Sequence, residues 1–265
     1  MVEGPPPQLV ARLRGAGCVF AEEEAALLVQ AARNGSAGDL EALVARRVAG
    51  EPLEQVLGWA EFAGLRILLE PGVFVPRRRT EALAVEAVRL ARGAVRPDHT
   101  PVVVDLCCGT GAIGAAVAVA VRPCELVAAD VDPAAVEAAR RNLERFGATV
   151  VQGDLYDALP AGLRGRIDVL AVNAPYVPTE EISMMPPEAR DREARVALDG
   201  GVDGLDVHRR VAASARSWLA PGGHLLIETS VRQASATAAL MAAGGLEPSV
   251  FRNEEVDGTV VIGAR

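Results

Sequence analysis

VVVDLCCGTGAIG, residues 102–114, joins an apolar run to three glycines spaced as G-x-G-x-x-G. The apolar run predicts a buried strand, and the residues after the glycines predict a helix. Glycines at such a turn let the backbone approach a ligand that faces the helix N-terminus. The spacing alone is a weak signal, because a tight strand-to-helix turn needs glycine for its dihedral angles in any case.

Helices and strands alternate from residue 80 to the C-terminus. The apolar patterns predict strands at 102–104, 126–129, 149–151, 167–172, 224–228, 250–251 and 260–262, and helices starting after 80 and at 113–121, 133–146, 207–218 and 234–242. This alternation predicts an α/β fold, in which a doubly wound, mostly parallel sheet carries helices on both faces.

The chain before residue 80 has a different character. Apolar residues at three- and four-residue steps predict helices over 8–49, broken at 34–38. Two short strands, 62–69 and 73–75, are expected to form a hairpin around Glu70-Pro71-Gly72. We therefore divide the chain into a small helical domain (1–58), a β-hairpin linker (59–76) and the α/β domain (77–265).

The composition narrows the classes of function. Half of the 265 residues are hydrophobic and the formal charge is −8, which argues against general nucleic-acid binding, although Arg77-Arg78-Arg79 forms a local basic cluster. The four cysteines show no metal-ligand spacing, and we expect no metal and no disulfide framework. The start MVEGPPPQLV lacks a signal-peptide pattern, and no apolar run approaches about 20 residues. We expect a cytoplasmic protein with no membrane association, and a monomer.

Acidic residues stand at three consecutive strand ends: Asp105 before the glycines, Asp130 about twenty residues later, and Asp154 after the third strand. A carboxylate at the position of Asp130 is placed to accept both hydroxyls of a ribose. Asp154 is placed to accept from an adenine amino group, whereas Asp132, followed by Pro133, is expected to cap a helix. An acidic strand end before G-x-G suits a cofactor with a cationic amino-acid group, so we expect S-adenosylmethionine (AdoMet), with S-adenosylhomocysteine as the product.

Asn173-Ala174-Pro175-Tyr176 follows the strand at 167–172. It resembles the (N/D)-P-P-Y motif of methyltransferases that modify planar –NH2 groups. The lone pair of such a nitrogen is delocalised, so the nitrogen is a poor nucleophile; one side-chain acceptor and one main-chain carbonyl can each take an N–H and orient it. Ala174 stands where the motif has its first Pro, and it still supplies the carbonyl. A plain turn is the alternative interpretation.

The chain from about residue 52 onward resembles the HemK/PrmC-like N5-glutamine methyltransferases, which modify the Gly-Gly-Gln motif of peptide chain release factors. The likeness rests on GWAEFAGLRILLEPGVFVPRRRTEALAVEA (58–87) and on ALDGGVDGLDVHRRVAASARSWLAPGGHLLIE (197–228). Glu193-Ala194-Arg195 departs from a Glu-Pro pair typical of that family. With the strand ends, the resemblance implies a cofactor site of Phe74, Asp105, Cys107, Gly109, Gly111, Asp130, Val131, Asp154, Leu155 and Asn173. It implies an acceptor site of Arg77, Asn173, Ala174, Pro175 and Tyr176, of which Asn173, Pro175 and Tyr176 are catalytic.

Three functions remain open at this point. The first is AdoMet-dependent methylation of a protein glutamine amide, in a release factor or another protein. The second is methylation of an amino group on a small molecule or a nucleic-acid base, the base version being weakened by the acidic charge. The third is non-catalytic AdoMet binding, suggested by Ala174. Cys107 and Cys108 are interpreted as small residues beside a ligand rather than nucleophiles, and the three histidines as structural or surface residues.

Overall fold

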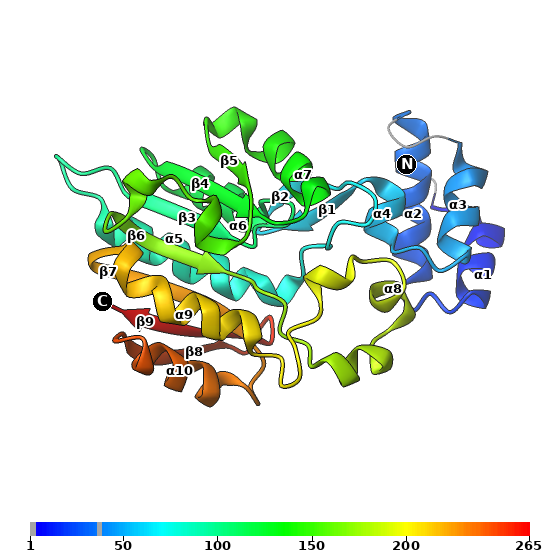
Figure 1. The fold of residues 1–265 in the computed structure, drawn as a ribbon. Helices are drawn as coiled ribbons and strands as arrows, with labels where there is room; N and C mark the ends of the chain where they lie inside the picture. Colours follow the sequence, from blue (N-terminus) through cyan, green and yellow to red (C-terminus); the bar gives the residue numbers. More distant parts are fainter. Residues whose placement is uncertain (1–3, 36–38) are drawn as a thin grey trace.

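The computed structural model describes residues 4–35 and 39–265, and its centre is one seven-stranded sheet (Figure 1). The strands are β3 (Val102–Leu106), β4 (Glu125–Asp130), β5 (Thr149–Gln152), β6 (Ile167–Val172), β7 (Leu219–Thr229), β8 (Glu247–Asn253) and β9 (Gly258–Ala264). Their order is β5-β4-β3-β6-β7-β9-β8; β3 to β7 run parallel, and β9 is antiparallel to both of its neighbours. The predicted doubly wound α/β fold is confirmed.

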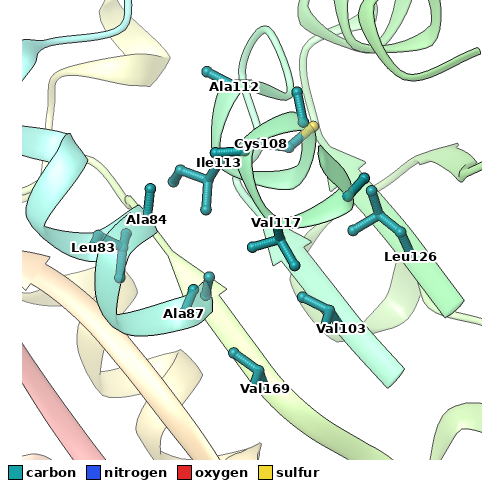
Figure 2. Packing of buried hydrophobic residues seen from close by; sticks show 14 of the residues in the cluster. Leu83, Ala84, Ala87, Val103, Cys108, Ala112, Ile113, Val117, Leu126 and Val169 are labelled. Carbon is teal, nitrogen blue, oxygen red and sulfur yellow. The ribbon is translucent and has the colours of Figure 1, made fainter. Parts of the chain in front are cut away.

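Helices cover both faces of this sheet because the strands are apolar on both sides. One face carries α5 (Glu81–Ala94), α6 (Ala112–Ala120) and α7 (Pro133–Leu143), and the other carries α9 (Asp206–Trp218) and α10 (Ala234–Ala243). Figure 2 shows Leu83 and Ala87 of α5 and Val117 of α6 near Val103 and Val169 of the sheet. Small side chains dominate these helix faces and let helix and sheet approach closely.

The strand order reverses at β3, whose two neighbours are β4 and β6. In open parallel sheets, ligands bind beyond the carboxyl ends of the strands at such a switch point. β3 is followed by the glycine turn and β6 by Asn173, so the fold brings the two segments that the sequence singled out to one edge.

The N-terminal helices are α1 (Pro7–Gly15), α2 (Ala21–Arg33), α3 (Leu40–Val48) and α4 (Leu53–Leu57), and they share a core of their own. Helices were predicted here, with a break at 34–38; α2 ends at Arg33, and residues 36–38 of the break lie outside the described residues, as do residues 1–3 of the N-terminal stretch. Side-chain hydrogen bonds help to fasten this part to the rest of the chain: Gln55 Nε2 donates to the Val73 carbonyl at 2.9 Å, and Arg192 donates to the Ala49 carbonyl at 3.3 Å.

The hairpin exists, but its predicted position was wrong. Its strands are β1 (Trp59–Phe62) and β2 (Leu65–Leu68), paired antiparallel. The turn lies at Ala63-Gly64, where both residues have positive φ (50° and 72°), and not at residues 70–72; 73–75 forms no strand. Two positive φ values in a two-residue turn match the right-handed twist of the strands, and Ala63 is an uncommon residue at such a position.

Between β6 and α9 the chain forms short helices rather than strands. They are η5 (Thr179–Met184), α8 (Pro187–Arg190) and η6 (Arg195–Ala197). Two more short helices, η3 (Leu155–Ala158) and η4 (Ala161–Leu163), follow β5, and η1 (Arg78–Thr80) precedes α5; η2 (Glu144–Phe146) extends α7. No helix in the described ranges has the length and apolar character to cross a membrane.

Candidate active site

A cavity of about 390 Å³ opens at the carboxyl ends of the parallel strands. Its wall contains most of the residues that the sequence predicted for the two sites. These are Phe74, Arg77, Cys107, Gly109, Asp130, Val131, Asp154, Leu155, Asn173, Ala174, Pro175 and Tyr176. Two predicted cofactor residues, Asp105 and Gly111, lie behind the wall. One cavity thus contains both the glycine turn and the Asn173–Tyr176 segment.

Asp130, at the end of β4, fixes the backbone of the glycine turn. Its Oδ2 accepts from the Gly109 N–H at 2.8 Å, and its Oδ1 accepts from the Asp132 N–H at 3.0 Å. A carboxylate oxygen has two lone pairs, so each oxygen retains capacity for a ligand hydroxyl. Asp132 accepts from the Ala134 N–H at 2.9 Å with Pro133 at the first helical position, so its predicted role as the cap of α7 is confirmed.

Asp105 is completely buried beneath the turn. Its Oδ2 accepts from the Gly114 N–H at 2.8 Å, while its Oδ1 has no hydrogen-bond partner among the described residues. Burial raises the pKa of Asp105 to about 8, and the nearby Asp130 charge adds to the rise. Asp105 therefore supports the turn from below and leaves one carboxyl oxygen, Oδ1, unpaired in a low-dielectric site.

Gly111 has a packing role. Its φ is +74°, and a Cβ there would lie 2.9 Å from Leu143 Cδ1 of α7. Gly109, with φ +53°, has no atom within 4 Å of the position that a Cβ would take, so the space beside it is open. Of the two glycines predicted to hold the cofactor, the structure places only Gly109 at the cavity.

Two residues of the wall, Cys107 and Leu155, have left-handed backbone conformations with φ values of 57° and 50°. Such conformations cost about 1 kcal/mol or more in residues other than glycine, and they cluster at functional sites. Burial raises the pKa values of the Cys107 and Cys108 thiols, so both are protonated near neutral pH. This agrees with their interpretation as small residues beside a ligand.

Asp154 has a cationic partner that the sequence did not reveal. Its Oδ2 accepts from Arg210 of α9 at 2.7 Å, and both side chains are about half exposed and line the cavity. Asp154 keeps its Oδ1 for another donor, as its predicted contact with an adenine amino group requires. Arg210 places a flat guanidinium at the same end of the cavity.

At the acceptor end, Asn173 Nδ2 donates to Thr80 Oγ1 at 3.3 Å. This bond uses the donor end of the Asn173 amide and leaves Oδ1 as the acceptor. In the described part of the chain, the main-chain carbonyl of Ala174 accepts no hydrogen bond. The two acceptors that the motif needs are therefore present, and the Ala174 carbonyl does not depend on a proline at that position.

Tyr176 is held at three points. Its hydroxyl donates to Glu228 Oε1 at 3.1 Å, its ring centroid lies 6.5 Å from that of buried His208, and its carbonyl accepts from Gln233 Nε2 at 2.9 Å. A Cβ on Gly204 would lie 2.3 Å from the Tyr176 carbonyl oxygen. The segment Asp203-Gly204-Leu205 therefore packs directly on the Asn173–Tyr176 segment.

Phe74 and Arg77 also line the cavity. The Arg77 guanidinium lies 4.9 Å from the centre of the Phe74 ring and donates to Glu193 Oε1 at 2.6 Å. Glu193 is buried and also accepts from the Val75 N–H at 3.2 Å. Burial raises the pKa of Glu193, and the Arg77 charge opposes the rise. The Glu193–Arg77 pair thus joins the residues after β2 to the segment between β6 and α9.

Several residues that shape this site were not predicted from the sequence: Thr80, Glu193, Arg210, Glu228 and Gln233. Glu228 offered a signal, since it follows the apolar run Leu225-Leu226-Ile227, where a charge is rarely buried without a partner. Arg210 and Gln233 lie on polar helix faces, and nothing in the sequence separates them from their neighbours. No group of three or more His, Cys, Asp or Glu residues in the described chain is arranged to hold a metal ion.

This chain resembles known methyltransferases over part of its length and part of theirs. The model of the "Methyltransferase small domain" family matches residues 64–202. The release factor glutamine methyltransferase of Geobacter sulfurreducens is 40% identical over 194 residues, which are 72% of this chain and 65% of that protein. The release factor glutamine methyltransferase of Moorella thermoacetica is 36% identical over 94% of this chain and 80% of its own length.

A relative with another substrate is equally similar. The 4-amino-L-phenylalanine/4-methylamino-L-phenylalanine methyltransferase of Streptomyces pristinaespiralis is 39% identical over 76% of this chain and 69% of its own length. Among solved structures, a methyltransferase from Pyrococcus furiosus matches with a TM-score of 0.55 at 18% identity, covering 84% of this chain and 96% of that one. At that identity the likeness concerns the fold.

Proposed function

Because this chain belongs to the family of the release factor glutamine methyltransferases, we propose that it methylates the side-chain amide nitrogen of a protein glutamine. The family and the fold imply a methyl donor of the AdoMet type. The acceptor we propose is an exposed glutamine loop, in a release factor or in a related protein target. A single observation supports this proposal most: Asn173 and the glycine turn face one cavity.

The residues of the wall and those just behind it fit AdoMet. Asp105, behind the wall, leaves a buried carboxyl oxygen unpaired below the turn, and the Asp130 oxygens keep lone pairs for ribose hydroxyls. Space is open beside Gly109, where a ligand must approach the backbone. When bound, AdoMet supplies an electrophilic methyl group on its sulfonium. We propose that Asp105 acts from beneath the turn, without lining the cavity, and that Asp130 and Gly109 contact the cofactor.

The acceptor end then has to orient a poor nucleophile. Asn173 Oδ1 and the Ala174 carbonyl each accept one N–H of the amide, which holds its nitrogen in one orientation. Tyr176 packs against the flat amide, and the surrounding wall excludes water. Orientation of this kind is worth up to about 7–11 kcal/mol in well-aligned reactions, an upper range.

A second candidate function rests on the relative from Streptomyces pristinaespiralis, whose name assigns it an aromatic amine substrate. An aromatic amine shares the planar –NH2 with an amide, and the same two acceptors would hold it. The apolar wall and Arg77 would then face a free amino acid. We favour the protein glutamine because this chain carries a helical N-terminal unit next to the cavity. Gln55 of this unit donates to the carbonyl of Val73, which lines the cavity, and the Ala49 carbonyl accepts from Arg192.

The experiment compares acceptors. The full chain is incubated with methyl-labelled AdoMet and, in separate reactions, a bacterial release factor, 4-amino-L-phenylalanine and duplex DNA. We expect one methyl group on a glutamine of the release factor, located by peptide mass spectrometry and absent with Asn173→Ala. Asn253→Ala, in β8, is the matched control and should methylate normally. Labelling of the amino acid alone would support the second candidate, and no label on any acceptor would contradict both.

A further inference from the structure

A buried amide, Asn142, joins the hairpin to the glycine turn. It is the next-to-last residue of α7 and is 7% exposed. Its Oδ1 accepts from the Leu68 N–H at 2.8 Å, and its Nδ2 donates to the Leu68 carbonyl and to the Thr110 carbonyl, both at 2.9 Å. One side chain therefore contacts both β2 and the turn between β3 and α6.

These three bonds fix the orientation of the Asn142 amide. A backbone N–H can only donate and a backbone carbonyl can only accept, so Oδ1 must face the Leu68 N–H and Nδ2 must face the two carbonyls. Both hydrogens of the Nδ2 group are used. Because all three partners are backbone groups, none of the bonds depends on an ionised side chain.

On the hairpin side, Asn142 takes the place of a neighbouring strand. Leu68 pairs with Trp59 of β1 on one edge, and on its other edge the Asn142 amide binds both of its backbone groups, as a third strand would. A hairpin of two strands is marginally stable by itself. α7 lies beside β2 (Figure 1), and Arg141 of α7 also pairs with Glu70, which follows β2. The hairpin is thus attached to α7 by two consecutive residues of that helix.

On the turn side, Asn142 holds a peptide group that its neighbours leave easy to rotate. Thr110 lies between Gly109 and Gly111, whose φ values are 53° and 74°, and glycine adopts many backbone conformations. Thr110 is buried and belongs to the cavity wall. The N–H of Gly111 donates to the Cys108 carbonyl at 2.7 Å, and Asn142 holds the carbonyl on the opposite side of the same peptide group. The two bonds together fix the plane of that peptide.

Side chains from β3, β4 and α7 hold the G-x-G-x-x-G segment by hydrogen bonds. Asp105 and Asp130 accept from its N–H groups, and Asn142 donates to its carbonyl at Thr110. We propose that Asn142 is a positioning residue of the cofactor site, which holds the glycine turn at the cavity and makes the hairpin a support for that turn. The inference rests on the proposed function, since it requires AdoMet to bind along the turn.

Two substitutions remove the donor to Thr110. Asn142→Asp keeps the acceptor for the Leu68 N–H but places an oxygen where the NH2 group faced two carbonyls, and Asn142→Leu removes all three bonds. We expect each variant to bind AdoMet about tenfold or more weakly by calorimetry, because the Thr110 carbonyl loses its partner. At saturating AdoMet, kcat should return to within about threefold of wild type, so that the loss appears in KM and not in kcat. Unchanged AdoMet affinity in both variants, or a loss confined to kcat, would overturn the proposal.

Two control variants separate the Thr110 bond from general effects on α7. Arg141→Met removes the ion pair with Glu70 and so loosens the hairpin, but it leaves the turn bonded to Asn142. Ala138→Gly weakens the same helix at a buried position without removing a side-chain hydrogen bond. Both controls should bind AdoMet as wild type does. A loss in either control as large as that in Asn142→Leu would show that hairpin attachment or helix stability governs binding, and would overturn the role of the Thr110 bond.

Hydrogen exchange tests the turn without cofactor or acceptor. In the ligand-free full chain, the backbone amides of residues 109–114 should exchange about tenfold or more faster in Asn142→Leu than in wild type, Arg141→Met and Ala138→Gly, as a locally opened segment does. Equal exchange in all of these proteins would overturn the inference. If wild type binds AdoMet but methylates no acceptor, the proposed acceptor fails while calorimetry and exchange still decide the role of Asn142. A wild type that binds no AdoMet would overturn both.

Discussion

The bonds that hold the glycine turn join residues close in sequence, whereas the bonds at the acceptor end of the cavity join distant parts of the chain. Asp105 reaches Gly114 over nine positions and Asp130 reaches Gly109 over 21. Arg77 reaches Glu193 over 116 positions, and Asn173 reaches Thr80 over 93. The glycine turn is thus a property of two neighbouring strand-to-helix units, and the acceptor end is a property of the assembled fold.

This difference implies that the two ends can be damaged separately. A substitution in the glycine turn should change cofactor binding, and a substitution in the Asn173–Tyr176 segment should change turnover.

Asn173→Ala removes the side-chain acceptor but none of the bonds that hold the glycine turn. We expect turnover to fall by about 10²–10³, comparable to the loss of one oriented catalytic hydrogen bond. AdoMet affinity, measured by calorimetry, should stay within about twofold, because the turn is held by its own bonds. Asn253→Ala, which removes an amide that accepts from the Glu255 N–H far from the cavity, should change neither quantity. Parallel losses of turnover and affinity in Asn173→Ala would contradict the separation.

Asp105→Asn tests the buried carboxyl of the cofactor end. Its folded pKa of about 8 lies above the ordinary 3.8, so its contribution to stability is complete below about pH 4 and is lost as the pH rises through 8. Between pH 6 and 8 this group should lower the free energy of unfolding by up to about 1.4 kcal/mol per pH unit. Asp105→Asn should remove that slope, as measured by urea unfolding of the ligand-free protein. Asp98→Asn, at an exposed position, should retain it, and an unchanged slope in Asp105→Asn would show that the carboxyl is ionised throughout.

The same difference explains how far the sequence could predict the site. The glycine turn, Asp130 and the Asp132 cap follow from local pattern, because each bonds within its own strand–turn–helix unit or the next one along the chain. The exceptions, Asp105 and Gly111, lie behind the wall. Period-two alternation places Asp105 on a face of its strand but does not say whether a loop covers it, and the glycine spacing does not show that Leu143 of α7 packs against Gly111. Glu193, Arg210 and Glu228 could not be assigned, because their partners are 116, 56 and 52 positions away.

The hairpin shows the same limit on a smaller scale. Glu70-Pro71-Gly72 carries stronger turn signals than Ala63-Gly64, and the hairpin turn was therefore predicted at residues 70–72. The strands nevertheless turn at Ala63, where alanine takes a left-handed conformation, and Glu81 Oε1 accepts from its N–H at 3.0 Å. That bond joins the turn to the start of α5. Tertiary contact therefore outweighed local preference at this turn.

Asp130→Ala is the converse of the Asn173 variant. It removes an acceptor for the ribose and also frees the N–H groups of Gly109 and Asp132. We expect AdoMet affinity to fall by about 1–3 kcal/mol, the usual cost of unpaired polar groups. At saturating AdoMet, turnover should return to within a few-fold of wild type, because the acceptor end is intact. Asp98→Ala removes the same charge at an exposed position and serves as the control; calorimetry that shows equal affinity for the Asp130 variant would remove this residue from the cofactor site.

The smallest effect is expected at Ala174, the residue that departs from the family motif. Its side chain is 2% exposed, and neither its N–H nor its carbonyl makes a hydrogen bond within residues 4–35 and 39–265, so a proline there breaks no such bond. Backbone freedom decreases from Ala174→Gly through wild type to Ala174→Pro, whereas the main-chain carbonyl of residue 174 is present in all three. The series therefore tests whether the site uses only that carbonyl. Turnover should then vary by no more than a few-fold across the series. The free energy of unfolding should rise from Gly to Ala to Pro by about 0.4–1 kcal/mol a step, through the entropy of the unfolded chain, as urea titration would measure. A turnover that climbs steeply toward Pro would mean that the rigidity of the motif contributes to catalysis, and that this chain has lost part of it.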